Sequence, residues 1–329
     1  MSVPVRALKC RRRATRRTRG PIKVTAAALA LIVGASACGS LGSGAVPLPL
    51  SVPGQPAGTI VVPTGADVPT VVQRVRDAIT SAGGSVLTVV DHTANARVAG
   101  VQIPPTTEVI GGPPAAGLPL LRLDQRAGAN LPQHYLVRQG PDGSVTLTTN
   151  SAEYLAAVSQ ITPNDASTAL HDSTGAVLNA VAPGNADVLP TALVGVTPFQ
   201  YLVTLASSAD IGVTVDRLRR AADRPPTRSV AVLDMAAGSA EGGPPIRPTS
   251  VVLATLPEVE AALVASAPSI GVDLPLRYVV WRDEQNRTQI GYPDVRRIAL
   301  RHGVNPDDPT VVRLVSDADR LARLGAGVN

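Results

Sequence analysis

Residues 131–150 read LPQHYLVRQGPDGSVTLTTN, and residues 274–293 read LPLRYVVWRDEQNRTQIGYP. The two stretches belong to a longer self-similarity, in which residues 67–150 align without a gap on residues 210–293 at a constant offset of 143. Of the 84 aligned positions 20 are identical. A chain this rich in Ala and Val would give about eight identities by chance. The sequence therefore predicts a tandem duplication of one domain.

Each copy shows the periodicities of mixed α and β structure. Asp67 is suited to be an N-cap, and apolar residues recur on one helical face from Val68 to Ile79. A four-residue turn joins the last two expected strands of each copy, and Gly143 of the first turn aligns with Asn286 of the second. Because Gly and Asn best tolerate a positive φ, we expect the same turn geometry in both hairpins. The strands expected in the first copy are 59–62, 86–91, 106–110, 133–138 and 145–149, with a closing helix over 152–159.

The first 37 residues predict a bacterial export signal. They contain nine basic and no acidic residues, and they end in the uncharged run VTAAALALIVGASA at 24–37. At 14 residues this run is too short to cross about 30 Å of hydrocarbon as a helix. The sequence ASACG at 35–39 resembles a lipobox, which makes Cys38 the candidate for lipidation. The alternative is ordinary cleavage after Ala37, with Cys38 as an incidental neighbour.

The charge of the chain changes sign once this signal is removed. The whole chain carries a formal charge of +5, but 21 basic and 25 acidic residues remain after residue 37, which leaves −4. Nucleic acid is therefore not an expected partner. Cys38 is the only cysteine that remains, so the exported part cannot form an internal disulfide. Its stability must come from apolar cores, and the repeats are long enough to have them.

An ordered series of short motifs resembles the domain-of-unknown-function family 302, which is found in bacteria and archaea. The resemblance covers about residues 66–159 and, more faintly, 209–302. It implies an α+β fold of two tandem β-α-β4-α domains, each a curved antiparallel sheet with helices on one side, as in TATA-binding-protein-like folds. It implies no established reaction. The motifs are Asp91-His92-x-Ala94, Pro105-Thr-Thr, Gly111-Gly-Pro, Gly117-Leu-Pro-Leu-Leu, Asn130-Leu-Pro and the turn Gly140-Pro-Asp-Gly143.

Composition and periodicity divide the chain into six segments. The tether between the signal and the first repeat is a Gly, Ser and Pro mixture, and the segment between the repeats carries a helical apolar stripe. The predicted segments are 1–37 signal peptide, 38–58 lipidated Cys and flexible tether, 59–160 first repeat, 161–198 helical connector, 199–304 second repeat and 305–329 C-terminal helix.

Familiar catalytic and cofactor motifs do not occur in the sequence. There is no His-Glu-x-x-His, paired Cys, Gly-x-Gly-x-x-Gly, P-loop or nucleophile elbow, so no metal or cofactor is expected. The candidate ligand-binding residues all lie in the first copy: His92, Arg97, Thr106 and Glu108. His92 also occupies the position of the family's His. Met235 stands at the corresponding place in the second copy. A site with convergent polar groups is therefore expected in the first copy or at its junction with the second.

Each titratable candidate also has a structural interpretation. We expect His171 and His302 to be solvated and His134 to be structural. For His92 the alternative interpretation is a structural histidine. For Glu108, independently, the alternative is a side chain that faces solvent on an edge strand.

Two functions remain. The first is a non-catalytic binding or structural module of the cell envelope, which is anchored in the membrane through Cys38 and holds a small molecule, a peptide or an envelope component. The second is an enzyme whose site combines His92, Glu108 and Arg97. An aromatic content of 2% and the scarcity of reactive motifs favour the first.

Overall fold

The computed structural model describes residues 55–162, 165–196, 201–237, 239 and 243–328. The predicted signal peptide, Cys38 and most of the tether lie outside the described residues. Within these ranges, no helix is both long and apolar enough to cross a membrane.

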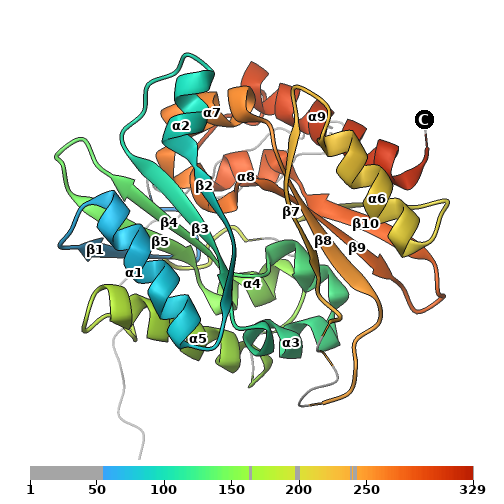
Figure 1. The fold of residues 1–329 in the computed structure, drawn as a ribbon, viewed down its shortest axis with the longest axis horizontal. Helices are drawn as coiled ribbons and strands as arrows, with labels where there is room; N and C mark the ends of the chain where they lie inside the picture. The colour runs from blue at the N-terminus through green and yellow to red at the C-terminus, as the bar shows by residue number, and fades with distance from the viewer. Residues whose placement is uncertain (1–54, 163–164, 197–200, 238, 240–242, 329) are drawn as a thin grey trace, which may run out of the picture. The chain divides into compact units, whose positions relative to one another are not determined.

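The first repeat folds around a five-stranded antiparallel sheet with the strand order β1-β5-β4-β3-β2 (Figure 1). Each strand pairs with a neighbour in antiparallel register, and the hairpin β4–β5 lies near the middle of the sheet. The elements are β1 (Thr59–Thr64), α1 (Val68–Ser81), β2 (Ser85–Asp91), α2 (His92–Val98), β3 (Thr106–Gly112), α3 (Pro114–Leu123), η1 (Gln125–Asn130), β4 (His134–Gln139), β5 (Val145–Asn150), α4 (Ala152–Val158) and α5 (Asp165–Val181).

The second repeat has the equivalent strand order, β6-β10-β9-β8-β7. Both sheets are antiparallel and have helices packed on them, so the predicted α+β fold of two repeats, each with its own sheet, is confirmed. The elements are β6 (Leu202–Ala206), α6 (Ile211–Ala222), β7 (Arg228–Asp234), β8 (Thr249–Thr255), α7 (Pro257–Ser266), η3 (Pro268–Asp273), β9 (Leu276–Arg282), β10 (Thr288–Pro293), α8 (Val295–Arg301) and α9 (Pro309–Ala326).

Helix α1 forms where the sequence pattern predicts it. The side chain of Asp67 accepts a hydrogen bond from the backbone N–H of Thr70, which satisfies one of the free donors at the helix start. The helix buries Val71, Val75 and Ile79 against one face of the sheet. Burial of one such side chain is worth about 1.5–3 kcal/mol, so this apolar stripe holds the helix to the sheet.

The predicted connector helix packs as a part of the first repeat. Helix α5 places Val177, Leu178 and Val181 in the same core as α1. The offset of 143 between the copies places the equivalent of α5 at residues 308–324. Helix α9 occupies this position in the second repeat. There α9 places Leu314 and Leu321 in the same core as Leu218 of α6. Each sheet therefore carries two long helices on its outer face, α1 with α5 and α6 with α9 (Figure 1).

The hairpin turns have the geometry that their residues predict. Gly143 has a φ of 83° and Asn286 a φ of 59°, both in the left-handed region. In each turn the N–H of this residue donates to the carbonyl oxygen three residues earlier, on Gly140 or Asp283. The duplicated turn therefore preserves its backbone, although most of its side chains differ.

The two repeats complete one another at their inner faces. The 3-10 helix η1 of the first repeat lies on the second sheet, and η3 of the second repeat lies on the first sheet. A Cβ atom on Gly271 of η3 would come within 2.9 Å of Leu136 in β4, and a Cβ on Gly128 of η1 would come within 3.0 Å of Val279 in β9. The glycine shared by both copies thus permits this reciprocal contact. Helix α2 also packs against α7 across the junction (Figure 1).

Candidate functional site

Five charged or titratable residues gather in the junction between the repeats, and we call them the junction cluster. The first repeat contributes three of them and the second repeat two, and none is more than 2% exposed. The residues are His92, Glu108, His134, Asp273 and Arg277.

The alternation of strand side chains directs the cluster toward the junction. On β3, Val109 packs in the core under α1, so its neighbour Glu108 points to the opposite face. On β4, Tyr135 packs in the same core and His134 points to the junction. On β9, Tyr278 packs in the core of the second repeat, so the adjacent Arg277 faces inward. The cluster thus forms where the inner faces of the two sheets carry charge instead of apolar side chains.

The first residue of α2 completes the first repeat's share of the cluster. Asp91 caps this helix by accepting a hydrogen bond from the N–H of Ala94 at 2.8 Å. His92 follows as a buried residue, and its Nε2 lies 4.0 Å from Oε2 of Glu108. Burial lowers the pKa of His92 to about 4, although the negative charge of Asp91 opposes this shift. His92 is therefore neutral near pH 7.

Glu108 and His134 form a buried pair. Oε1 of Glu108 lies 2.8 Å from Nδ1 of His134. Burial raises the pKa of Glu108 well above its usual range, and the positive charge of Arg277 opposes this. Burial also lowers the pKa of His134 well below its usual range, and Arg277 lowers it further. Both shifts favour a neutral pair that shares one proton.

Arg277 is the most unusual member of the cluster. It is 1% exposed, and none of its three guanidinium nitrogens has a hydrogen-bond partner among the described residues. The nearest carboxylate oxygen, Oδ1 of Asp273, is 3.7 Å from Nη2. Buried arginines are normally paired and hydrogen-bonded, so this guanidinium group needs an explanation.

Three further nitrogen and oxygen atoms of the cluster also lack a partner within the described part of the chain. They are Nε2 of His92, Oε2 of Glu108 and Nε2 of His134. Unsatisfied buried polar atoms cost about 1–3 kcal/mol each, so several of them in one place call for an explanation such as a bound water, a bound ion or a functional role.

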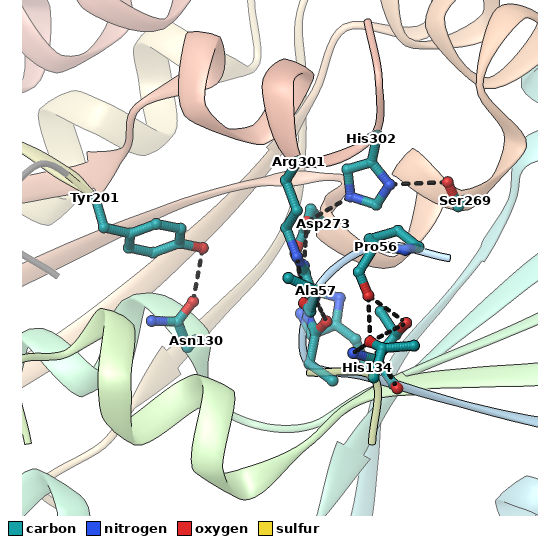
Figure 2. Close-up of polar contacts among 12 residues, drawn as sticks. Pro56, Ala57, Asn130, His134, Tyr201, Ser269, Asp273, Arg301 and His302 are labelled. Carbon is teal, nitrogen blue, oxygen red and sulfur yellow. Dashed lines mark hydrogen bonds and ion pairs between the residues drawn. The ribbon is translucent and has the colours of Figure 1, made fainter. Parts of the chain in front are cut away.

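Asp273, by contrast, has partners at both of its carboxylate oxygens (Figure 2). Its Oδ2 accepts a hydrogen bond from Nη1 of Arg301 at 2.7 Å and lies 2.8 Å from Nε2 of His302. Its Oδ1 accepts a hydrogen bond from the side-chain amide of Asn150 at 3.1 Å. Burial alone would raise the pKa of Asp273, but Arg301 and His302 hold it well below its usual range. Asp273 is therefore ionised, and its charge is shared by several partners.

Further contacts tie this network to the rest of the junction. Arg301 donates to the carbonyl oxygen of Ala57 and stacks its guanidinium group 3.7 Å from the ring centroid of Tyr154. Nδ1 of His302 lies 2.9 Å from Oγ of Ser269. Figure 2 shows Ser269, His302 and Asp273 in one continuous chain of contacts.

The structure brings together two of the four predicted ligand residues. His92 and Glu108 meet in the junction cluster, whereas Arg97 is exposed on α2 and Thr106 donates its hydroxyl to the carbonyl oxygen of Pro104. The predicted trio of His92, Glu108 and Arg97 therefore does not assemble. The arginine of the cluster is Arg277, which comes from the second repeat.

Two predictions about exposure are wrong. Glu108 does not face solvent on an edge strand, because β3 lies between β4 and β2 and its inner face is covered by the second repeat. His302 is not solvated but 4% exposed, because Asp273 and Ser269 bind both of its ring nitrogens. His171 is partly exposed and lies 3.0 Å from Glu153. Cys38 lies outside the described residues.

The sequence contains one further signal, which points to Arg277. This charged residue stands between Leu276 and Tyr278 in an apolar strand, at the position that aligns with His134. A basic or titratable residue thus occurs at the same inward position of both copies. No cluster of three or more His, Cys, Asp or Glu residues within the described ranges is arranged to hold a metal ion.

Comparison with known families agrees with the duplication. Residues 60–181 and residues 203–321 both match the family described as "Domain of unknown function DUF302". The chain belongs to the DUF302 family. Its two DUF302 segments begin at equivalent positions of the two repeats, and they include most or all of α5 and α9.

The chain is also similar to parts of other proteins. It is 35% identical over 100 residues to "Fluoride-specific ion channel FluC 1" of Brucella suis biovar 1 (strain 1330), covering 30% of this DUF302 chain and 39% of that protein. The protein of the same name from Brucella abortus biovar 1 (strain 9-941) is also 35% identical over 100 residues, which cover 30% of this chain and 37% of that protein. The chain therefore spans less than two fifths of the curated relatives it matches. A crystal structure of an uncharacterized DUF302 protein from Bacillus stearothermophilus has a TM-score of 0.35 and 14% identity, covering 38% of this chain and 97% of that one.

Proposed function

We propose that this DUF302 protein is a non-catalytic binding module of the cell envelope, and that its junction cluster holds a small anion. A lipid on Cys38 anchors it in the membrane, and residues 39–54 form the tether, since Pro56, Ala57 and Gly58 bind to the folded repeats. The sequence before the first repeat supports this address, since a basic, acid-free segment and a 14-residue apolar run precede Cys38.

The observation that carries the anion proposal is the buried guanidinium group of Arg277. A charged group removed from water is unfavourable unless a partner compensates it, and Asp273 already serves Arg301 and His302. An anion beside Arg277 supplies the missing charge and accepts its free N–H groups. Because every cluster residue is at most 2% exposed, the ligand has to be small.

Fluoride is the anion to test first. The Brucella relatives are named fluoride-specific ion channels, and this chain resembles 100 residues of them. The proposed module would then bind the ion that appears in the names of these relatives. Chloride and nitrate are the appropriate comparison anions, because they carry the same charge but are larger.

Calorimetric titration of the full chain with sodium fluoride tests the proposal. We expect saturable binding to the wild type and at least a tenfold weaker affinity for Arg277→Met. Arg282→Met is the matched control, since this arginine lies at the end of the same strand and donates to the carbonyl oxygen of Asn286 outside the cluster. The control should bind like the wild type. No binding of any of the three anions, or equal binding by Arg277→Met, would overturn the anion site.

The proposed membrane location is tested separately. Cys38→Ala should shift the full-length protein from the membrane fraction to soluble material, or leave the uncleaved precursor in place. Unchanged partitioning into a detergent phase would contradict the lipid anchor.

One observation favours a second candidate function, a serine hydrolase. Ser269, His302 and Asp273 form a chain of contacts of 2.9 and 2.8 Å, like a catalytic triad. The ring nitrogens are used in the opposite order, because Ser269 faces Nδ1 and Asp273 faces Nε2. All three residues are at most 5% exposed, which is unfavourable for substrate access. Labelling of Ser269 by a fluorophosphonate probe, and its loss in Ser269→Ala, would support this function. An unlabelled wild type would exclude it.

A further inference from the structure

We propose that, at a pH high enough to ionise Glu108 in the free protein, the anion enters the junction cluster together with one proton, and that Glu108 carries this proton. The inference rests on the proposed anion site and describes how that site is regulated. It follows from the charges of the buried groups and from the contact between Glu108 and His134.

For the cluster residues together with Arg301, two charge states can be compared. Arg277 and Arg301 contribute two positive charges, and Asp273 contributes one negative charge. With neutral histidines, an ionised Glu108 brings the sum to zero without any anion. A protonated Glu108 leaves one positive charge, which one monovalent anion neutralises. The buried junction therefore stays neutral if the anion and the proton arrive and leave together.

The Glu108–His134 contact gives the proton a second effect. An ionised Glu108 accepts a hydrogen bond from Nδ1–H of His134, which leaves a lone pair on Nε2. A protonated Glu108 donates to Nδ1 instead, so that Nε2 carries the hydrogen. Nε2 of His134 has no partner within the described residues. The same proton thus changes this free nitrogen from an acceptor, which repels an anion, to a donor, which binds one.

Other titratable groups face Glu108 from the surrounding elements. They are His92 on α2, His134 on β4, Asp273 on η3, Arg277 on β9 and Glu260 on α7. His92 stays neutral because burial lowers its pKa to about 4. Glu260 is the main competing proton acceptor, since burial raises its pKa to about 7. Its two oxygens, however, accept hydrogen bonds from Thr255 and from the backbone N–H of Leu256.

The test is the fluoride affinity of the full chain between pH 5 and pH 9. Once Glu108 is ionised in the free protein, uptake of one proton with the anion requires the affinity to fall by about tenfold for each further pH unit. Calorimetry in two buffers of different ionisation enthalpy should show the uptake of one proton per anion in that range. Glu108→Gln imitates the protonated acid, so it should bind at high pH with little pH dependence.

The control is Glu260→Gln, which should retain the slope of the wild type. A flat profile in the wild type, an unchanged slope in Glu108→Gln or a lost slope in Glu260→Gln would each overturn the proton coupling, while the anion site itself would stand. A wild type that binds no anion at any pH would instead overturn the proposed function. If Glu108→Gln does not fold, the proton coupling is tested by the number of protons that the wild type takes up per bound anion. A wild type that takes up no proton in that range would overturn the coupling.

Discussion

Asn130 in η1 and Asp273 in η3 occupy equivalent positions of the two repeats, and each accepts a side-chain hydrogen bond from the other repeat. Asn130 accepts from the hydroxyl of Tyr201 at 2.9 Å, and Asp273 accepts from the amide of Asn150 at 3.1 Å. The equivalent residue of each repeat therefore accepts a hydrogen bond that links the two repeats. Only Asp273 carries a charge, and its carboxylate lies 3.7 Å from Arg277 and 2.7 Å from Arg301.

Asp273→Asn should strongly destabilise the fold. Removing one partner of a buried ion pair leaves the other unpaired and costs about 3–5 kcal/mol. Urea unfolding of the full chain measures the change. Asp319→Asn is the control, because Asp319 is 43% exposed and its pair with Arg323 is worth at most about 1 kcal/mol. Similar losses in both variants would contradict the structural role of Asp273.

The contribution of Asp273 should also depend on pH in one direction. Its pKa in the folded state lies below the unfolded value of about 3.9, so the stability it provides is complete above that value. This stability is lost progressively as the pH falls below the unfolded value toward the folded pKa. Unfolding midpoints between pH 2.5 and pH 7 should therefore fall more steeply with acid for the wild type than for Asp273→Asn. Parallel curves for the two proteins would contradict the depressed pKa.

Arg277→Met should unfold at the same or a higher urea concentration than the wild type when no anion is added. Replacing a poorly compensated buried charge by an apolar side chain of similar length is often neutral or stabilising by about 1–4 kcal/mol. The measurement separates a residue that is kept for binding from one that is kept for stability. A loss of stability of similar size would show that Arg277 is a structural residue.

Gly271→Ala should weaken the packing between the repeats. The new Cβ would lie 2.9 Å from Leu136 and 3.6 Å from Nε2 of His92, and such overpacking costs about 1–3 kcal/mol. Gly212→Ala in α6 is the control, since a Cβ there meets no atom within 4 Å. This control should gain up to about 1 kcal/mol from helix propensity. Equal thermal midpoints for the two variants would contradict the close contact.

Asp67→Ala should cost about 1 kcal/mol, because Asp67 caps α1 by accepting a hydrogen bond from Thr70. Asp210 is the equivalent N-cap of α6, but its side chain makes no capping hydrogen bond. Asp210→Ala should therefore change the unfolding free energy by a few tenths of a kcal/mol at most. The two substitutions form a matched pair in one chain, and a larger loss in Asp210→Ala would contradict the capping difference.

Local signals are sufficient for much of the fold. The apolar spacing and the cap at Asp67 predict α1, and the turn residues Gly143 and Asn286 predict the duplicated hairpin. The constant offset between the copies predicts two versions of one sheet, which the structure confirms. The helix and the turns depend on interactions between residues close in sequence, so periodicity and turn chemistry report them directly.

The site depends on contacts between distant residues, and for this reason the sequence predicts it only in part. Glu108 is buried by elements of the second repeat, and nothing next to it in sequence indicates that cover. Helix α2 escapes prediction because a seven-residue helix provides little periodicity. Helix α5 resembles a connector in the sequence because the gapless alignment of the two copies ends before it.

The exchange of η1 and η3 has a consequence for the symmetry of the junction. A chain with one repeat would leave the inner face of its sheet uncovered, but two such chains could make the same exchange around a two-fold axis. In the present protein the exchange takes place within one chain, so a residue of one repeat and its equivalent in the other repeat do not have to be identical. Two identical chains would have the same residue at 134 and 277, and the same residue at 130 and 273. In this single chain these pairs are histidine with arginine and asparagine with aspartate, so the interior of the junction is electrically asymmetric.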